Sequence, residues 1–102
     1  MSSVRALIDG LVASIREGDG QAPREQRCAA FANAGLTGPV RTLVDKVASR
    51  ARDVHDEDIA AARASGSSED QIFELVVCAA VGQAMRQYAS ARAALDATTR
   101  SE

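Results

Sequence analysis

The chain has 102 residues, with 12 Lys or Arg against 14 Asp or Glu and an isoelectric point near 5.4. This length fits one domain, and the slight acidity provides no positive field for a phosphate backbone, so nucleic acid is excluded as an expected partner. Only 3% of the residues are aromatic, so small aliphatic side chains must fill the core, and we expect a marginally stable monomer that self-associates.

The first two helices are predicted within residues 3–35. Apolar residues spaced by three and four indicate an amphipathic helix that the segment EGDGQ ends: Val4, Leu7, Ile8, Leu11, Val12 and Ile15. Pro23 suits the first turn of a second helix, because an N–H would be unpaired there. The buried side of that helix is expected to carry Cys28, Phe31 and Ala32. Gly35 is expected to end it in the left-handed conformation.

A third helix is predicted to begin in the segment LTGP, with Thr37 or Gly38 as the N-cap and Pro39 in the first position. It should end near Asp53 or Val54. Its expected buried face consists of Val40, Leu43, Val44, Val47, Ala48 and Ala51. A short fourth helix follows in HDEDIAAARASG, where the carboxylates at the amino end are favoured by the helix dipole and Gly66 ends the helix.

The last helix contains the most apolar run of the chain, QIFELVVCAAVGQAM. Ser68 and Gln71 have the spacing of a capping box, and the helix should run to about Leu95, with ATTRSE frayed. No strand-like alternation occurs, so the sequence predicts an all-α single domain of about five helices. Asp9 interrupts the N-terminal apolar pattern, so neither a signal peptide nor a membrane span is predicted, and we expect a cytoplasmic protein.

Cys78 is the first candidate for chemistry, because it lies near the centre of that apolar run. Its nearest expected companion is Glu74, four residues earlier on the same helix face. An acidic neighbour and an apolar environment both raise the pKa of a thiol, whereas a reactive cysteine needs the opposite environment. We therefore interpret Cys78 as a core residue. Cys28, on a less apolar helix, is interpreted in the same way, with greater exposure and ionisation left open.

Glu74 and His55 are the two remaining candidates. A carboxylate inside an apolar helix should have a perturbed pKa, and we expect either an arginine partner in another subunit or a role as a general base. His55 precedes Asp56, Glu57 and Asp58, but adjacent helical residues point in different directions, so capping is favoured over metal binding. Neither a metal nor an organic cofactor is expected, since no motif for either is present.

Three features occur in order along residues 53–95: a helix ending in AAARASG, a Ser-led cap with EDQIFEL, and a long alanine-rich helix closing on ARAAL. In this order the chain resembles the carboxymuconolactone decarboxylase and alkylhydroperoxidase D superfamily. The preceding VRTLVDKVASRA fits the family's previous helix, so the family-like core spans residues 38–96. The resemblance implies a helical fold that assembles as trimers or hexamers, with the long helix near the subunit contacts.

Redox members of that superfamily carry a CxxC pair followed by a histidine. The resemblance places the two cysteine positions at Ala51 and Val54 and the histidine position at Asp58, so none of the three matches, and His55 is one residue past the second cysteine position. The expected function is therefore a non-redox oligomeric scaffold or small-molecule binding protein, and we lean away from an enzyme. Two alternatives stay open: acid–base chemistry of the decarboxylase or lactone type using Glu74, and a one-cysteine peroxidase using Cys28 or Cys78.

Overall fold

The computed structural model describes residues 2–100, and the side chains of residues 6–100, as five α-helices and one short 3-10 helix without strands. The α-helices are α1 (Ser2–Glu17), α2 (Arg24–Ala32), α3 (Gly38–Ser49), α4 (Asp56–Ala64) and α5 (Glu69–Arg100), and the 3-10 helix η1 spans Ala51–Asp53. The predicted all-α class with a long C-terminal helix is confirmed. Within these described residues, no helix is both long and apolar enough to cross a bilayer.

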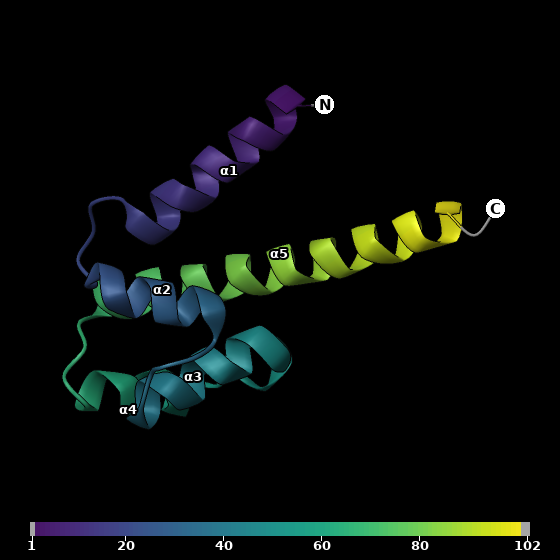
Figure 1. Cartoon of the computed structure of the whole chain (residues 1–102). Coiled ribbons are helices and arrows are strands. Elements are labelled where there is room, and N and C mark those ends of the chain that lie inside the picture. The colour runs from purple at the N-terminus through teal and green to yellow at the C-terminus, as the bar shows by residue number, and fades with distance from the viewer. Residues whose placement is uncertain (1, 101–102) are drawn as a thin grey trace.

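The helices α2 and α3 pack most extensively against the first half of α5, and α4 packs against α3 and α5 (Figure 1). The second half of α5 extends beyond this body, and α1 rises from the body at an angle to it. The molecule therefore measures 54 × 28 × 20 Å, with a Cα radius of gyration of 15.6 Å. A compact chain of this length has a radius of gyration of about 13 Å.

Small aliphatic side chains form the core, as the composition predicts. One cluster joins α2, α3 and α5 and contains Ala22, Ala30, Val44, Leu75, Cys78 and Ala79. A second cluster joins α3, α4 and α5 and contains Leu43, Ala62 and Ile72. The expected face of α3 is confirmed for Leu43, Val44 and Ala48, whereas Ala51 lies in η1 and is exposed.

Several predicted helix ends are confirmed and others are corrected. Ser68 and Gln71 exchange hydrogen bonds of 3.1 and 2.9 Å at the start of α5, as the capping-box spacing predicts. Thr37 is the N-cap of α3, although Pro39 occupies its second position rather than its first. Asn33, at φ 53°, is the left-handed residue that caps α2, so this helix ends before Gly35.

Two further expectations were wrong in detail. The α3 helix ends at Ser49, and η1 takes up the turn to α4. The α5 helix continues through Arg100 instead of fraying after Leu95. This segment is rich in alanine, which has the highest helix propensity, and the hydroxyls of Thr98 and Thr99 donate to carbonyls of the preceding turn. Residues 101–102 lie outside the described part of the chain.

Gly82 is the point of closest approach between α2 and α5. A Cβ atom at this position would overlap the backbone of Phe31, including its carbonyl oxygen. Arg86, one turn later, donates to the same carbonyl at 2.6 Å, so the C-terminal end of α2 is fixed to α5 by contact and by hydrogen bond.

Candidate functional site

Glu74 holds the connection between α1 and α2 against α5. Its Oε2 accepts a hydrogen bond of 2.8 Å from the backbone N–H of Gln21, and its Oε1 accepts one of 3.0 Å from the N–H of Ala22. Gly20 allows this approach, because a Cβ there would overlap the carboxylate. The carboxylate therefore satisfies two loop amides that lie before the first turn of α2.

Arg27, on α2, completes this cluster from the other side. Its side chain is only 5% exposed, and its guanidinium donates from Nε to the Ala22 carbonyl at 3.1 Å and from Nη1 to the Ile15 carbonyl at 3.3 Å. The Ile15 carbonyl is in the last turn of α1, where carbonyls lack intrahelical partners and a positive charge is favoured. Arg27 thus joins α1, the α1–α2 connection and α2.

The electrostatics of Glu74 follow from these contacts. The N–H of Ala22 lowers its pKa from the ordinary value of 4.5, partial burial acts in the opposite direction, and the N–H of Gln21 and the charge of Arg27 lower the pKa further. The expectation of a perturbed pKa is confirmed. Within the chain, the neighbouring cation is Arg27 and backbone amides supply the hydrogen bonds, while an arginine from another subunit stays a prediction.

Cys78 lies one turn after Glu74, inside the core. Its side chain is 1% exposed, and its Sγ lies 3.6 Å from the Ile15 carbonyl, to which it is positioned to donate. Burial raises the pKa of the thiol, Arg27 opposes this, and Cys28 and Glu74 raise the pKa further. The interpretation of Cys78 as a neutral core thiol is confirmed in its burial and in the direction of the pKa.

Cys28 lies on α2 next to the buried Arg27 and is half-buried. Both cysteines are free thiols, as the sequence predicts. The predicted buried face of α2 was rotated by about one residue: Arg27 and Ala30 are buried, while Phe31 is half-buried and Ala32 is exposed. The greater exposure left open for Cys28 is therefore what the structure shows.

The two thiols should differ sharply toward an alkylating reagent. We expect iodoacetamide to label Cys28 in the native protein and to label Cys78 only when the core opens, because alkylation requires an accessible thiolate. Peptide mass spectrometry after timed quenching measures both rates. Labelling of Cys78 as fast as Cys28 at neutral pH would contradict its placement in the core.

His55 does not belong to this cluster and lies at the N-cap of α4. Its backbone N–H donates to the Asp58 carboxylate at 2.8 Å, and Lys46 pairs with the same carboxylate at 2.9 Å. The N–H of His55 and then Lys46 lower the pKa of Asp58. Among the described residues, no three His, Cys, Asp or Glu side chains form a group able to hold a metal ion.

The structure thus brings together Glu74, Cys78 and Cys28, and places His55 elsewhere. Arg27 is the member of the cluster that the sequence interpretation missed. The available signal was its spacing, since Arg27 lies three residues before Ala30 and four after Pro23 on one face of a short helix. Arginines are mostly found on the surface, so the charge of Arg27 gave no reason to expect this side chain to be buried.

The hollows on the surface do not enclose this cluster. Glu74 and Arg27 border an open depression of 320 Å³ between the end of α1 and the start of α5, beside Phe73 and Val77. A larger depression, of 680 Å³, lies elsewhere, between α2, the α2–α3 connection and the α4–α5 turn. Among the residues that the structure describes, the carboxylate borders only this open depression, and both of its oxygens accept hydrogen bonds from the chain itself.

No known protein-family model matches the chain, and no curated protein or solved structure matches it either. The resemblance to the carboxymuconolactone decarboxylase-like superfamily therefore stays a prediction from the residues.

Proposed function

We propose that this chain is a non-redox, carboxymuconolactone decarboxylase-like scaffold protein that works as a homo-oligomer. The observation that carries the proposal is the use of Glu74: both carboxylate oxygens bind backbone amides of the α1–α2 connection. Cys78, the other candidate in the cluster, is buried with a raised pKa. The polar groups best placed for chemistry thus stabilise the fold.

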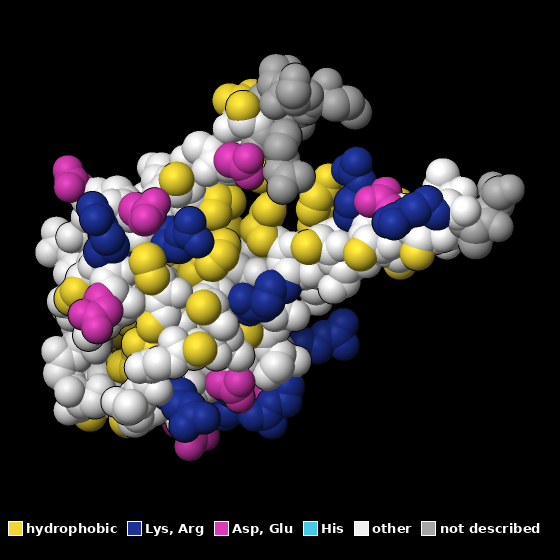
Figure 2. Space-filling model, viewed as in Figure 1, with side chains coloured by type: hydrophobic (Ala, Val, Ile, Leu, Met, Phe, Trp, Pro, Cys, Tyr) yellow, Lys and Arg dark blue, Asp and Glu magenta, His cyan; other side chains and the backbone are white. Residues whose placement is uncertain are grey.

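The surface supports the oligomeric part of the proposal. Large apolar side chains are exposed on α1 and α5, among them Leu7 at 74%, Leu11 at 63% and Phe73 at 68%. Apolar side chains gather in the notch between these two helices (Figure 2). Contiguous apolar surface of this kind marks an interaction site in a stable protein. The trimer or hexamer that the resemblance implies, and a cytoplasmic location, remain parts of the proposal.

A concentration series tests the proposal. Association that is coupled to folding makes the melting temperature rise with protein concentration, by mass action. We expect Tm to rise over about a hundredfold range of concentration, and sedimentation to give a multiple of the 10.7 kDa chain mass. A constant Tm together with a mass of one chain throughout the series would contradict the proposed function.

A further inference from the structure

An apolar strip runs along the side of α5 that faces away from α3 and α4 and borders the notch beside α1. Its members recur at alternating spacings of four and three residues: Val77, Val81, Ala84, Tyr88, Ala91 and Leu95. We call these six residues the α5 seam. Each of them is half-buried or exposed, including Tyr88 at 48% and Leu95 at 65%. Spacings that alternate between four and three residues form the pattern with which one helix packs along another.

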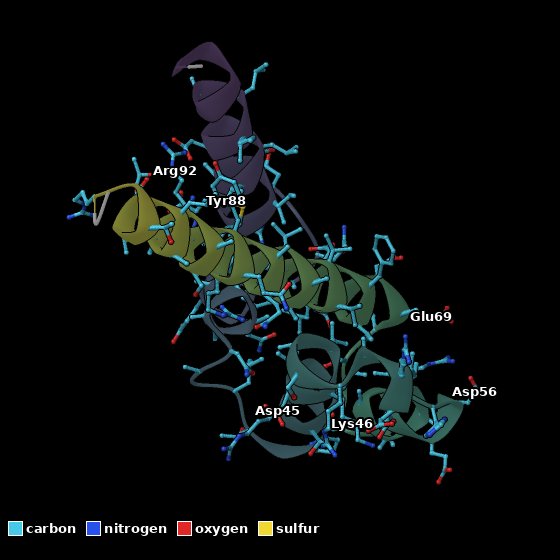
Figure 3. The ribbon with its side chains drawn as sticks, turned by 90° about the vertical axis from the view of Figure 1, so that its right-hand side faces the viewer. Asp45, Lys46, Asp56, Glu69, Tyr88 and Arg92 are labelled. Atoms are coloured by element: carbon cyan, nitrogen blue, oxygen red, sulfur yellow. The ribbon has the colours of Figure 1, made fainter. Side chains whose placement is uncertain are left out.

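The α5 seam faces away from the core of its own chain. At about 100° per residue, it lies on the side of the helix opposite the buried residues. Those buried residues are Ile72, Leu75, Cys78, Ala79 and Gly82. Figure 3 shows Tyr88 on the side of α5 that faces α1, away from α3 and α4.

The second half of α5 carries its large apolar side chains on the seam. Beyond Met85, the side that continues the buried face carries Arg86, Ser90, Asp96 and Arg100 among small alanines and no large apolar residue. The two large apolar residues of this half, Tyr88 and Leu95, lie on the seam. Packing within the chain does not account for this pattern, because residues 86–100 are all exposed. A helix that is apolar on an exposed face is built for a partner.

The accessible area is sufficient for such a partner. The chain exposes 6957 Å². A compact monomer of the same mass exposes about 5,500 Å², and a stable interface buries about 800 Å² on each partner. The chain therefore exposes about 1,400 Å² more surface than a compact monomer, and this extra area is larger than the area that one standard interface buries on each chain.

From these observations we infer that the α5 seam is a two-fold contact, in which α5 of a second copy lies antiparallel along it. This inference rests on the proposed homo-oligomer and specifies the surface that forms it. A two-fold contact gives a dimer by itself, and a hexamer when it is combined with a three-fold contact elsewhere.

Charge and shape select the antiparallel direction. The first turn of α5 is acidic, with Glu69 and Asp70, whereas the last third carries Arg92 and Arg100 against Asp96. Antiparallel pairing places each basic end near the acidic end of the partner and opposes the two helix dipoles. It also lays the projecting half of each α5 over the outer face of the partner's body, whereas parallel pairing would bring the two bodies together (Figure 1).

The seam also fixes the register. Pairing the whole seam with itself centres the two-fold axis near Arg86, so Ala84 faces the partner's Tyr88, and Val77 faces the partner's Leu95. The small side chains at positions 84 and 91 allow close approach beside the tyrosine ring, as in knobs-into-holes packing. Arg86 itself points toward α2, where it binds the Phe31 carbonyl, so the two copies of this cation do not oppose each other on the seam.

Two matched substitutions test the contact. Ala84→Glu places a charge on the seam, and Ala93→Glu places the same charge on the opposite side of the same exposed helical segment. We expect light scattering to show the particle mass of Ala84→Glu reduced twofold or to a smaller assembly, with Ala93→Glu equal to wild type. Circular dichroism should show unchanged helix content in both, because both positions are exposed in the single chain.

Spin labels test the direction. A label on Thr99→Cys, in a Cys28→Ala background, should lie about 39 Å along the helix axis from its copy in the antiparallel pair, and about 10 Å from it in a parallel pair. Double electron–electron resonance measures this distance. The short distance would overturn the antiparallel assignment.

The possible results separate the inference from the proposed function. An oligomer whose mass is unchanged by Ala84→Glu, or a trimer without a two-fold axis, would overturn the seam contact and leave the homo-oligomer standing. A monomer at every concentration would overturn both. Loss of mass in Ala84→Glu alone, together with the long label distance, supports the contact.

Discussion

Gly82→Ala should destabilise the protein by about 2–3 kcal/mol and lower Tm by about 15 °C. The added methyl group would overlap the backbone of Phe31, which is the C-terminal end of α2. Backbone gives way less easily than a flexible side chain, so α2 must move away from α5. That movement also disturbs the hydrogen bond from Arg86 to the Phe31 carbonyl. Thermal and urea unfolding followed by circular dichroism measure the change.

Gly10→Ala is the matched control, because it makes the same chemical change in a helix. No atom outside its own helix lies within 4 Å of a Cβ at position 10. Alanine is the better helix former by about 0.5–1 kcal/mol, so this variant should be as stable as wild type or more stable. Equal effects of the two substitutions would show that the close approach at Gly82 does not limit stability.

Glu74→Gln should lower the free energy of unfolding by about 2 kcal/mol and Tm by about 10 °C. The carboxamide keeps the size of the side chain but presents an NH₂ group to one of the two backbone N–H donors, from Gln21 or Ala22. It also removes the negative charge near the buried Arg27. The exposed Glu69→Gln, in the first turn of the same helix, is the control and should change stability by less than about 0.5 kcal/mol.

The effect of Glu74 on stability should depend on pH. Its pKa is lower in the folded chain than the ordinary 4.5, so the unfolded chain binds the proton more readily. The contribution is therefore complete above about pH 5 and is lost as the pH falls through the folded pKa. The difference between wild type and Glu74→Gln should narrow over that range. A difference that widens on acidification would mean that the sign of the shift is wrong.

Local patterns in the sequence were sufficient to predict most helices. The capping pair Ser68 and Gln71, the N-cap Thr37 and the apolar face of α3 all depend on residues within a few positions of each other. The wrong predictions concern helix ends, whose positions depend on tertiary contacts or on competition between neighbouring residues for the capping position. Asn33 adopts the left-handed conformation before Gly35 does, and the alanine-rich end of α5 stays helical beyond Leu95.

The candidate site was predicted only in part. The position of Cys78 and its neighbour Glu74 follows from spacing within one helix, and the structure confirms both the burial and the direction of the thiol pKa. The partners of Glu74 lie more than fifty residues away, on a connection without periodicity. No spacing rule links a helical carboxylate to loop amides, so that contact was not accessible from the sequence, and the spacing of Arg27 indicated only its face of α2.

The central claim is that Glu74 is a structural anion that holds the α1–α2 connection. The most direct test is the pKa of its side-chain carboxyl, followed by carbon-13 NMR of the native protein, with Glu74→Gln assigning the resonance. We expect the carboxyl of Glu74 to have a pKa below the ordinary 4.5, because two backbone amides and a nearby guanidinium favour the carboxylate form. A pKa raised toward neutrality would contradict it, and would indicate a carboxyl tuned for proton transfer.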